Sequence, residues 1–258
     1  MNRIVSHPKC GRTWLRAMLA YAIGPTHDVE LPKFMFSTST FKKVEPTFPD
    51  CTHDAAVDAV SYDAMKLDTA DFVGKRVLFL VRDPIDTVVS WYYHQTFRIN
   101  NWHGDINAFV CDPQWGIRKI IRFYNRWYAA RRVPVAFMPL AYESLRKYPA
   151  KMLRRVIRFF DLSPAYLRNV ASAVHATTFE RMQALERDRT VRLAVDRLRA
   201  RGVPLDQPYS DVRRFKVRRG AIGKGVDELT PQTRTRCYRW MREMNCAYYV
   251  NKNAWRKS

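Results

Sequence analysis

A short segment near the start of the chain combines residue types that bind phosphate. It reads His7-Pro-Lys-Cys-Gly-Arg-Thr-Trp14 and directly follows Arg3–Ser6, which is typical of a short buried strand. Gly11 permits close approach of the backbone to a ligand, and Lys9 brings a positive charge. Thr13 adds a hydroxyl at the expected start of a helix, where backbone N–H groups attract anions. The segment therefore predicts a phosphate-binding loop.

A second segment places an arginine and a serine eight residues apart. It reads Val81-Arg-Asp-Pro-Ile-Asp-Thr-Val-Val-Ser-Trp-Tyr-Tyr93. Arg82 ends an apolar run, and Pro84 suits the first turn of the helix that would carry Ser90. An arginine binds phosphate through two parallel hydrogen bonds, and a serine on a helix adds a hydroxyl donor. We expect a second anion site here.

Two further features complete the chemistry. The segment Phe215–Lys224 is basic and contains two glycines, so it can fold over an anion. Six histidines are available as a base near neutral pH, and composition alone does not choose among them. His53 follows a predicted strand, at the end of a parallel sheet where ligands bind.

Strands alternating with helices must position these residues. The best strand is Lys75–Val81, a continuous apolar run typical of a parallel sheet covered on both faces. The pattern predicts one α/β domain over residues 1–258, a three-layer P-loop-like fold with a central parallel sheet flanked by helices. The other expected strands are residues 3–6, a strand ending near residues 51–53, and 133–138; the expected helices are 13–23, 84–96, 105–110, 116–131 and 143–160.

Composition limits the partners. The 258 residues carry a formal net charge of +21, which favours anions such as nucleotides, nucleic acid, acidic glycans or lipid headgroups. The five scattered cysteines predict neither a disulfide framework nor a metal site. Without a signal-peptide pattern or a long apolar run, the chain is expected in the cytoplasm.

The first loop resembles the 5′-phosphosulfate loop of the sulfotransferases that use 3′-phosphoadenosine 5′-phosphosulfate (PAPS). That loop is usually written Y-P-K-S-G-T-T-W-L, and His7, Cys10 and Arg12 are the departures here. His7 stands in the place of the family's Tyr and is therefore interpreted as structural. The resemblance implies that Lys9 stabilises the leaving phosphate and that Trp14 lies against the adenine. It also implies that the loop holds the 5′-phosphate through Cys10, Gly11, Arg12 and Thr13.

The second and third segments are similar to the remaining donor motifs of this family. The segment from Arg82 to Ser90 resembles R-[ND]-P-x-D-x-x-x-S, which implies that both residues bind the 3′-phosphate. Arg218, Arg219 and Gly220 resemble the R-K-G-x-x-G motif, although Lys224 and Gly225 replace its usual Asp-Trp. We therefore expect closure over the nucleotide to differ in detail.

Weaker matches lie elsewhere, and together the matches run in family order from Val5 to about Thr230. Thr52-His53 resembles a K-T-H segment in which Cys51 replaces the lysine, and this implies that His53 is the general base. The catalytic set that the resemblance implies is His53, Lys9 and Ser90. The further donor contacts that it implies are Tyr142, Thr178 and Phe179.

The implied reaction is in-line transfer of a sulfuryl group from PAPS to a hydroxyl acceptor, with 3′-phosphoadenosine 5′-phosphate (PAP) as the product and no metal. The basic surplus favours an anionic glycan or glycolipid as the acceptor, and contact with an anionic membrane surface. Phe34–Pro49 and Arg187–Asp211 are expected to shape the acceptor pocket.

Two alternatives remain. A P-loop kinase would need a Walker A lysine and a Mg²⁺-binding carboxylate, but Ser6 and Arg12 occupy the first glycine and the lysine of that pattern. A nucleic-acid-binding protein would suit the charge, yet no helix-turn-helix, zinc-finger or RNP pattern is evident.

Overall fold

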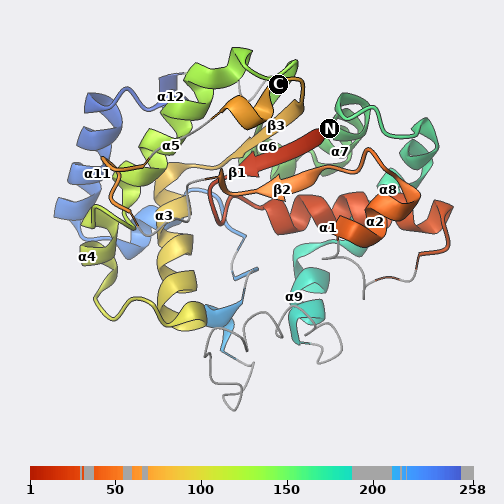
Figure 1. Ribbon diagram of the computed structural model, residues 1–258. Helices are drawn as coiled ribbons and strands as arrows, with labels where there is room; N and C mark the ends of the chain where they lie inside the picture. Colours follow the sequence, from red (N-terminus) through yellow and green to blue (C-terminus); the bar gives the residue numbers. More distant parts are fainter. Residues whose placement is uncertain are drawn as a thin grey trace.

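The computed structural model contains a parallel sheet flanked by helices (Figure 1). It describes residues 1–29, 31, 38–54, 60–65, 69–187, 211–215, 217–218 and 220–250. Within this part of the chain the sheet has four strands in the order β2-β1-β3-β4, all parallel. The strands are β1 (Asn2–Ser6), β2 (Asp50–Thr52), β3 (Arg76–Val81) and β4 (Ala136–Ala141). The expected central parallel sheet is confirmed.

The centre of the sheet is apolar on both faces. Ile4 of β1 pairs with Leu78 of β3, and both side chains are fully buried. On one face, Phe79 of β3 stacks on Trp127, with ring centroids 5.8 Å apart. Each such buried side chain contributes about 1.5–3 kcal/mol relative to exposure. This burial explains why the run in β3 carries no polar alternation.

Two groups of helices cover the sheet, one on either side (Figure 1). The helices α1, α7 and α8 contact one another, while α3, α5, α11 and α12 form the second group around α5. The α-helices are α1 (Arg12–Ile23), α2 (Thr38–Val44), α3 (Pro84–Tyr93), α4 (Ile106–Cys111), α5 (Ile117–Ala129), α6 (Tyr142–Lys147), α7 (Pro149–Phe159), α8 (Val170–Ala176), α9 (Phe179–Arg187), α11 (Pro231–Glu243) and α12 (Ala247–Val250). The shorter turns are η1 (Gly24–Thr26), η3 (Ala70–Phe72), the π-helix η4 (His94–Ile99), η5 (Ala130–Arg132), η6 (Pro164–Asn169), η8 (Val212–Arg214) and η9 (Gly225–Glu228).

The fourth strand begins later than the sequence suggested. A strand was expected over 133–138, but β4 pairs with β3 from Ala136 to Ala141. The N–H of Val133 instead closes a turn onto the carbonyl of Ala130, at 2.9 Å. Pro134 has no N–H to give to a ladder. Because residues 133–135 include valines, the apolar pattern placed the start of the strand too early, within a turn.

The predicted helix 143–160 is two helices. The helix α6 ends at Lys147, and α7 starts at Pro149. Tyr148 lies between them in a non-helical conformation, with φ −134° and ψ 57°. A residue before proline is driven out of the helical region by the proline ring, which accounts for the break. The helix expected over 84–96 likewise changes at His94 into the π-helix η4.

The sheet brings the predicted site residues to one edge. Because β1, β2 and β3 are parallel, their carboxyl ends at Ser6, Thr52 and Val81 open on the same side. The loop before α1, His53, and the turn before α3 therefore meet there.

Candidate active site

A cleft of about 930 Å³ lies at this edge. Its basic lining residues are Lys9, Arg12, Arg16, Arg82, Arg98, Arg146, Arg218 and Lys224. Its acidic lining residues are Asp86 and Glu228. Both accept hydrogen bonds from the protein, Asp86 from the backbone of Gly223 and Gly225 and Glu228 from Tyr93 and Arg218. Such a volume suits a nucleotide-sized ligand, and the surplus of positive charge selects an anion.

The first loop presents its backbone to the cleft. Gly11 precedes α1 in a left-handed conformation, with φ 95°, and as the N-cap residue it offers no side chain to cap the first N–H groups of the helix. A Cβ at Gly11 would lie 2.5 Å from the ring of Tyr142, so the tight contact requires glycine. The uncapped N–H groups are thus available to an anion beside Lys9 and Thr13, which also line the cleft.

Cys10 turns the other way. Its side chain is fully buried, and its Sγ lies 3.2 Å from the hydroxyl of Tyr124. Burial raises the pKa of this thiol to about 11, so it stays protonated and unreactive near neutral pH. Any contact of Cys10 with the donor is therefore limited to its backbone.

An aromatic wall adjoins the loop. Trp14 donates its indole N–H to the carbonyl of Thr177 at 2.7 Å and meets the ring of Tyr142 edge-on, with centroids 6.2 Å apart. Phe179 of α9 also lines the cleft, and it lies so close to Gly220 that a Cβ there would be 2.7 Å from the Phe179 ring. These rings form an apolar slot for a flat base. Thr178 instead supports the first turn of α9 and is not among the described residues that line the cleft.

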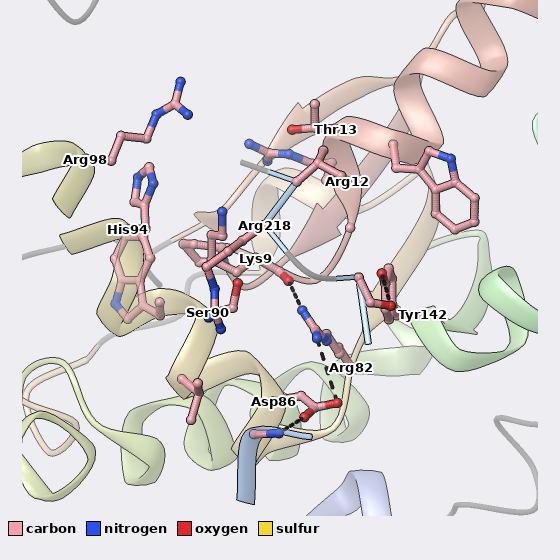
Figure 2. Close-up of a pocket in the computed structure, with 18 of the residues that line it drawn as sticks. Lys9, Arg12, Thr13, Arg82, Asp86, Ser90, His94, Arg98, Tyr142 and Arg218 are labelled. Atoms are coloured by element: carbon pink, nitrogen blue, oxygen red, sulfur yellow. Dashed lines mark hydrogen bonds and ion pairs between the residues drawn. The ribbon is translucent and has the colours of Figure 1, made fainter. Parts of the chain in front are cut away.

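Arg82 lines the cleft, and Figure 2 shows it between the carbonyl of Lys9 and the carboxylate of Asp86. Its guanidinium donates to the carbonyl of Ala221 at 3.1 Å, and it lies 4.7 Å from the ring centroid of Tyr142. Within the described part of the chain, its buried Nε–H has no partner. Ser90 lines the same cleft two turns along α3. A buried guanidinium with an unused donor fits an anionic ligand at this point.

The turn that carries Arg82 is held rigidly. Asp83 caps α3 by accepting from the N–H groups of Ile85 and Asp86, at 2.9 and 3.1 Å. Its other oxygen accepts from Tyr249 of α12 at 2.6 Å, and its own N–H donates to Glu143. Pro84 starts α3, as expected. These contacts fix where the strand ends and thus where Arg82 points.

The third segment folds over the cleft and is tied down by Asp86. One Asp86 oxygen accepts from the N–H of Gly223 at 2.7 Å and the other from that of Gly225 at 2.8 Å. Arg218 lies over the ring of Tyr93 at 3.6 Å and pairs with Glu228. Arg219, also predicted here, lies outside the described residues. Sequence reasoning assigned no role to Asp86, although it stands in the second motif.

His53 lies at the cleft between a carbonyl and a guanidinium. Its Nδ1 donates to the carbonyl of Ser6 at 2.9 Å, and its Nε2 accepts from Arg12 at 2.6 Å. His7 is buried in the core against Trp91, and burial lowers its pKa to about 3. His7 therefore has the structural place expected of it.

Sequence reasoning missed the far end of the cleft. His94 lies there, stacked on Trp91 with ring centroids 5.2 Å apart, so two histidines line the cleft among the described residues. Gln95 and Arg98 follow in η4, both nearly buried. Within the described residues, Oε1 of Gln95 and Nε of Arg98 lack a hydrogen-bond partner. A π-helix within a longer helix often marks such a site, but it has no sequence signature as clear as a glycine-rich loop.

Two absences concern only the part of the chain that the structure describes. There, no group of three or more His, Cys, Asp or Glu side chains could hold a metal ion. No helix in the described ranges is long and apolar enough to cross a membrane. Of the segments expected to shape the acceptor pocket, residues 34–37 and 188–210 lie outside the described residues, while 38–49 are described and 41–49 do not line the cleft.

The geometry defines an α/β protein with two anion-directed loops at the carboxyl edge of a parallel sheet. The sulfotransferase domain family model matches residues 3–245. The chain therefore belongs to the sulfotransferase family and is a transferase. No curated protein sequence matches it significantly.

Solved structures share the fold. A crystal structure of retinol dehydratase in complex with androsterone and inactive cofactor PAP has a TM-score of 0.61 at 13% identity, covering 94% of this chain and 80% of that chain. Mouse sulfotransferase SULT7A1 complexed with PAP has a TM-score of 0.59 at 15% identity, covering 97% and 86%. Retinol dehydratase in a complex with retinol and PAP has a TM-score of 0.60 at 14% identity, covering 94% and 80%. The α/β architecture inferred from the sequence is therefore that of these proteins.

Proposed function

We propose that this sulfotransferase transfers the sulfuryl group of PAPS to a hydroxyl acceptor by in-line displacement, with His53 as the general base. Family membership supports the reaction class, and the related structures hold PAP, the product of PAPS. The observation that carries the proposal is the cationic cleft, which is lined by Arg82 and by the aromatic rings of Trp14 and Tyr142.

The donor site follows from these contacts. Trp14 and Phe179 receive the adenine, while Arg82 and Ser90 receive the 3′-phosphate. The uncapped start of α1, with Lys9 and Thr13, receives the 5′-phosphosulfate. The unused Nε–H of Arg82 supports this placement, because a buried donor costs free energy until an acceptor reaches it.

The chain's residues then divide the chemical work. His53 takes the proton of the acceptor hydroxyl at Nε2, while the carbonyl of Ser6 holds Nδ1 protonated. A positioned base contributes about 10²–10⁴-fold to the rate. Lys9 lies in the same cleft and stabilises the negative charge that grows on the departing bisphosphate. Such a donor is worth about 3–4 kcal/mol.

The far end of the cleft receives the acceptor. Gln95 and Arg98 offer polar atoms beside the rings of Trp91 and Trp115. Polar groups at an aromatic surface suit a sugar-like, anionic acceptor such as a glycan or glycolipid. We place the reaction in the cytoplasm, against an anionic membrane surface. The net charge of +21 and the five free cysteines support this location.

Calorimetric titration with PAP, ADP and ATP tests the donor site. PAP should bind the full chain far more tightly than ADP, which lacks the 3′-phosphate. In Arg82→Ala, PAP binding should weaken about 100-fold while ADP binding hardly changes, because a charge-assisted pair is lost. Ser90→Ala should show the same selectivity with a smaller loss.

Arg158→Ala is the matched control, because it removes the same charge from an exposed position on α7. It should leave PAP binding unchanged. Equal or tighter binding of ATP than PAP would overturn the proposal and favour a nucleotide-dependent kinase. Thermal melting checks that each variant is folded.

A further inference from the structure

His53 is locked in one tautomer from both sides. The carbonyl of Ser6 can only accept, so the 2.9 Å contact places a proton on Nδ1. The guanidinium of Arg12 can only donate, so the 2.6 Å contact places the lone pair on Nε2. The two contacts independently agree. The atom that should take the acceptor's proton is therefore already occupied by Arg12.

This occupation has a consequence for catalysis. A neutral imidazole has one ring lone pair, and a base must reach its proton within about 2.6–3.2 Å. While Arg12 donates to Nε2, an acceptor hydroxyl cannot use that lone pair. His53 can work as a base only after Arg12 has moved to another partner.

Arg12 lacks a strong partner where it lies. Its Nη1 is buried and has no hydrogen-bond partner, and no ion pair to Arg12 is found among the described residues. Burial lowers the pKa of its guanidinium, and the charge of Arg16, one turn along α1, acts in the same direction. A guanidinium that is desolvated beside another cation gains most from an anion.

The position of Arg12 indicates which anion it meets. Arg12 is the first residue of α1, between the backbone of Gly11 and the side chain of Thr13, and all three line the cleft. Figure 2 shows Arg12 and Thr13 at the same part of the cleft as Lys9. An anion bound at the start of α1 therefore lies within the reach of this long side chain.

We propose that Arg12 acts as a gate that controls access to His53. In the free protein Arg12 occupies Nε2 of His53, and when the sulfuryl donor binds, Arg12 transfers to the 5′-phosphosulfate. This inference rests on the proposed function. Release of Nε2 lets the acceptor hydroxyl approach. The hydroxyl oxygen then bonds to sulfur as the bond between sulfur and the bridging oxygen breaks. The hydroxyl proton goes to Nε2, and the electron pair leaves with PAP. The base is thus available only once a donor is in place.

Nitrogen NMR of the full chain with ¹⁵N-labelled histidine tests the gate without turnover. In the wild type, addition of PAP should shift the His53 Nε2 signal, because that atom loses a charged hydrogen-bond donor. In Arg12→Met without PAP, the signal should already lie near its PAP-bound position. Arg16→Met, which removes a neighbouring cation, should keep the wild-type response. A signal that stays in place on saturation with PAP would overturn the gate.

Ligand affinities supply a second test. Arg12→Met should lower the affinity for PAP about 10- to 100-fold, as expected for loss of a charged hydrogen bond. The same substitution should leave the affinity for adenosine 3′-phosphate unchanged, because that ligand lacks the 5′-phosphate. Arg82→Ala should lower the affinity for both ligands. Arg12→Lys should retain part of the PAP affinity. Equal affinity of wild type and Arg12→Met for PAP would overturn the gate alone. Failure of the wild type to bind PAP would overturn the proposed function itself.

Discussion

The two ends of the cleft are built in different ways. At the donor end, backbone groups do much of the work, because Gly11, Gly223 and Gly225 each make contacts through the main chain. At the far end, the side chains of Gln95 and Arg98 carry the polar atoms. Backbone sites require particular glycines at particular spacings, whereas side-chain sites tolerate many solutions. The donor end is therefore recognisable as a motif, and the far end is not.

Both ends contain buried polar atoms that have no hydrogen-bond partner among the described residues. Asp86, which holds the donor loop, accepts one N–H on each oxygen. Gln95 is only 4% exposed, and its Oε1 has no partner in the described part of the chain. An unpaired buried carbonyl costs about 1–3 kcal/mol, so it marks a place where a ligand restores a hydrogen bond. At the donor end the atoms without a partner among the described residues include N–H groups of Arg12 and Arg82, so both ends are incomplete in the free protein.

The largest expected effect is on the rate of sulfuryl transfer, and it should distinguish His53 from His94, the two histidines that line the described part of the cleft. His53→Ala should lower the rate of sulfuryl transfer about 10²–10⁴-fold, since it removes the base. PAP affinity should persist, because His53 has no place among the predicted phosphate contacts. The measurement is single-turnover transfer from labelled PAPS to a panel of hydroxyl compounds.

His94→Ala is the matched comparison. His94 stacks on Trp91 at the end of the cleft that we propose for the acceptor, so its loss should raise the acceptor KM and leave the single-turnover rate at saturation close to that of the wild type. If instead His94→Ala abolishes turnover while His53→Ala retains it, the base assignment moves to the far end of the cleft.

A smaller effect is expected at Gln95. Gln95→Leu removes an amide whose oxygen has no hydrogen-bond partner among the described residues, so the free energy of unfolding should stay the same or rise. Transfer to glucuronic acid should fall about 10-fold relative to transfer to cyclohexanol, because a polar acceptor loses a hydrogen bond. Competing-acceptor assays with labelled PAPS measure the ratio. An unchanged ratio would show that polarity at this end does not select the acceptor.

The smallest effect concerns the core beneath the donor loop. The pKa of His7 is lowered to about 3 by burial, below its ordinary value of 6.5. As the pH falls, His7 takes up a proton in the unfolded chain before it does so in the folded one. The free energy of unfolding therefore keeps the full contribution of His7 above about pH 6.5 and decreases as the pH drops toward 3. The slope from this group is about 1 kcal/mol per pH unit. His7→Phe should flatten that slope, as measured by urea unfolding between about pH 8 and pH 5. Parallel slopes for the two proteins would contradict it.

Much of the fold could be predicted because the signals are local. The apolar run of β3 and the proline at the start of α3 appear in the structure where the sequence indicated. The strand over 133–138 and the unbroken helix over 143–160 were wrong, because apolar spacing does not register a proline's missing N–H or its effect on the preceding residue. The family inferred from the loop motifs is confirmed by the family match. The individual site residues stay predictions.

Residue type and spacing along the chain were enough to indicate an anion-binding α/β protein, because loops that follow parallel strands need glycines and cations at set positions. Spacing could not show that Cys10 turns into the core while Arg12 reaches His53, 41 residues away in sequence. Nor could it show that Asp86 holds a loop 137 residues further on. These relations depend on whether each side chain points into the core or into the cleft once β1, β2 and β3 lie together. That choice is made by packing and by the need to pair buried polar groups, which act through space rather than along the chain.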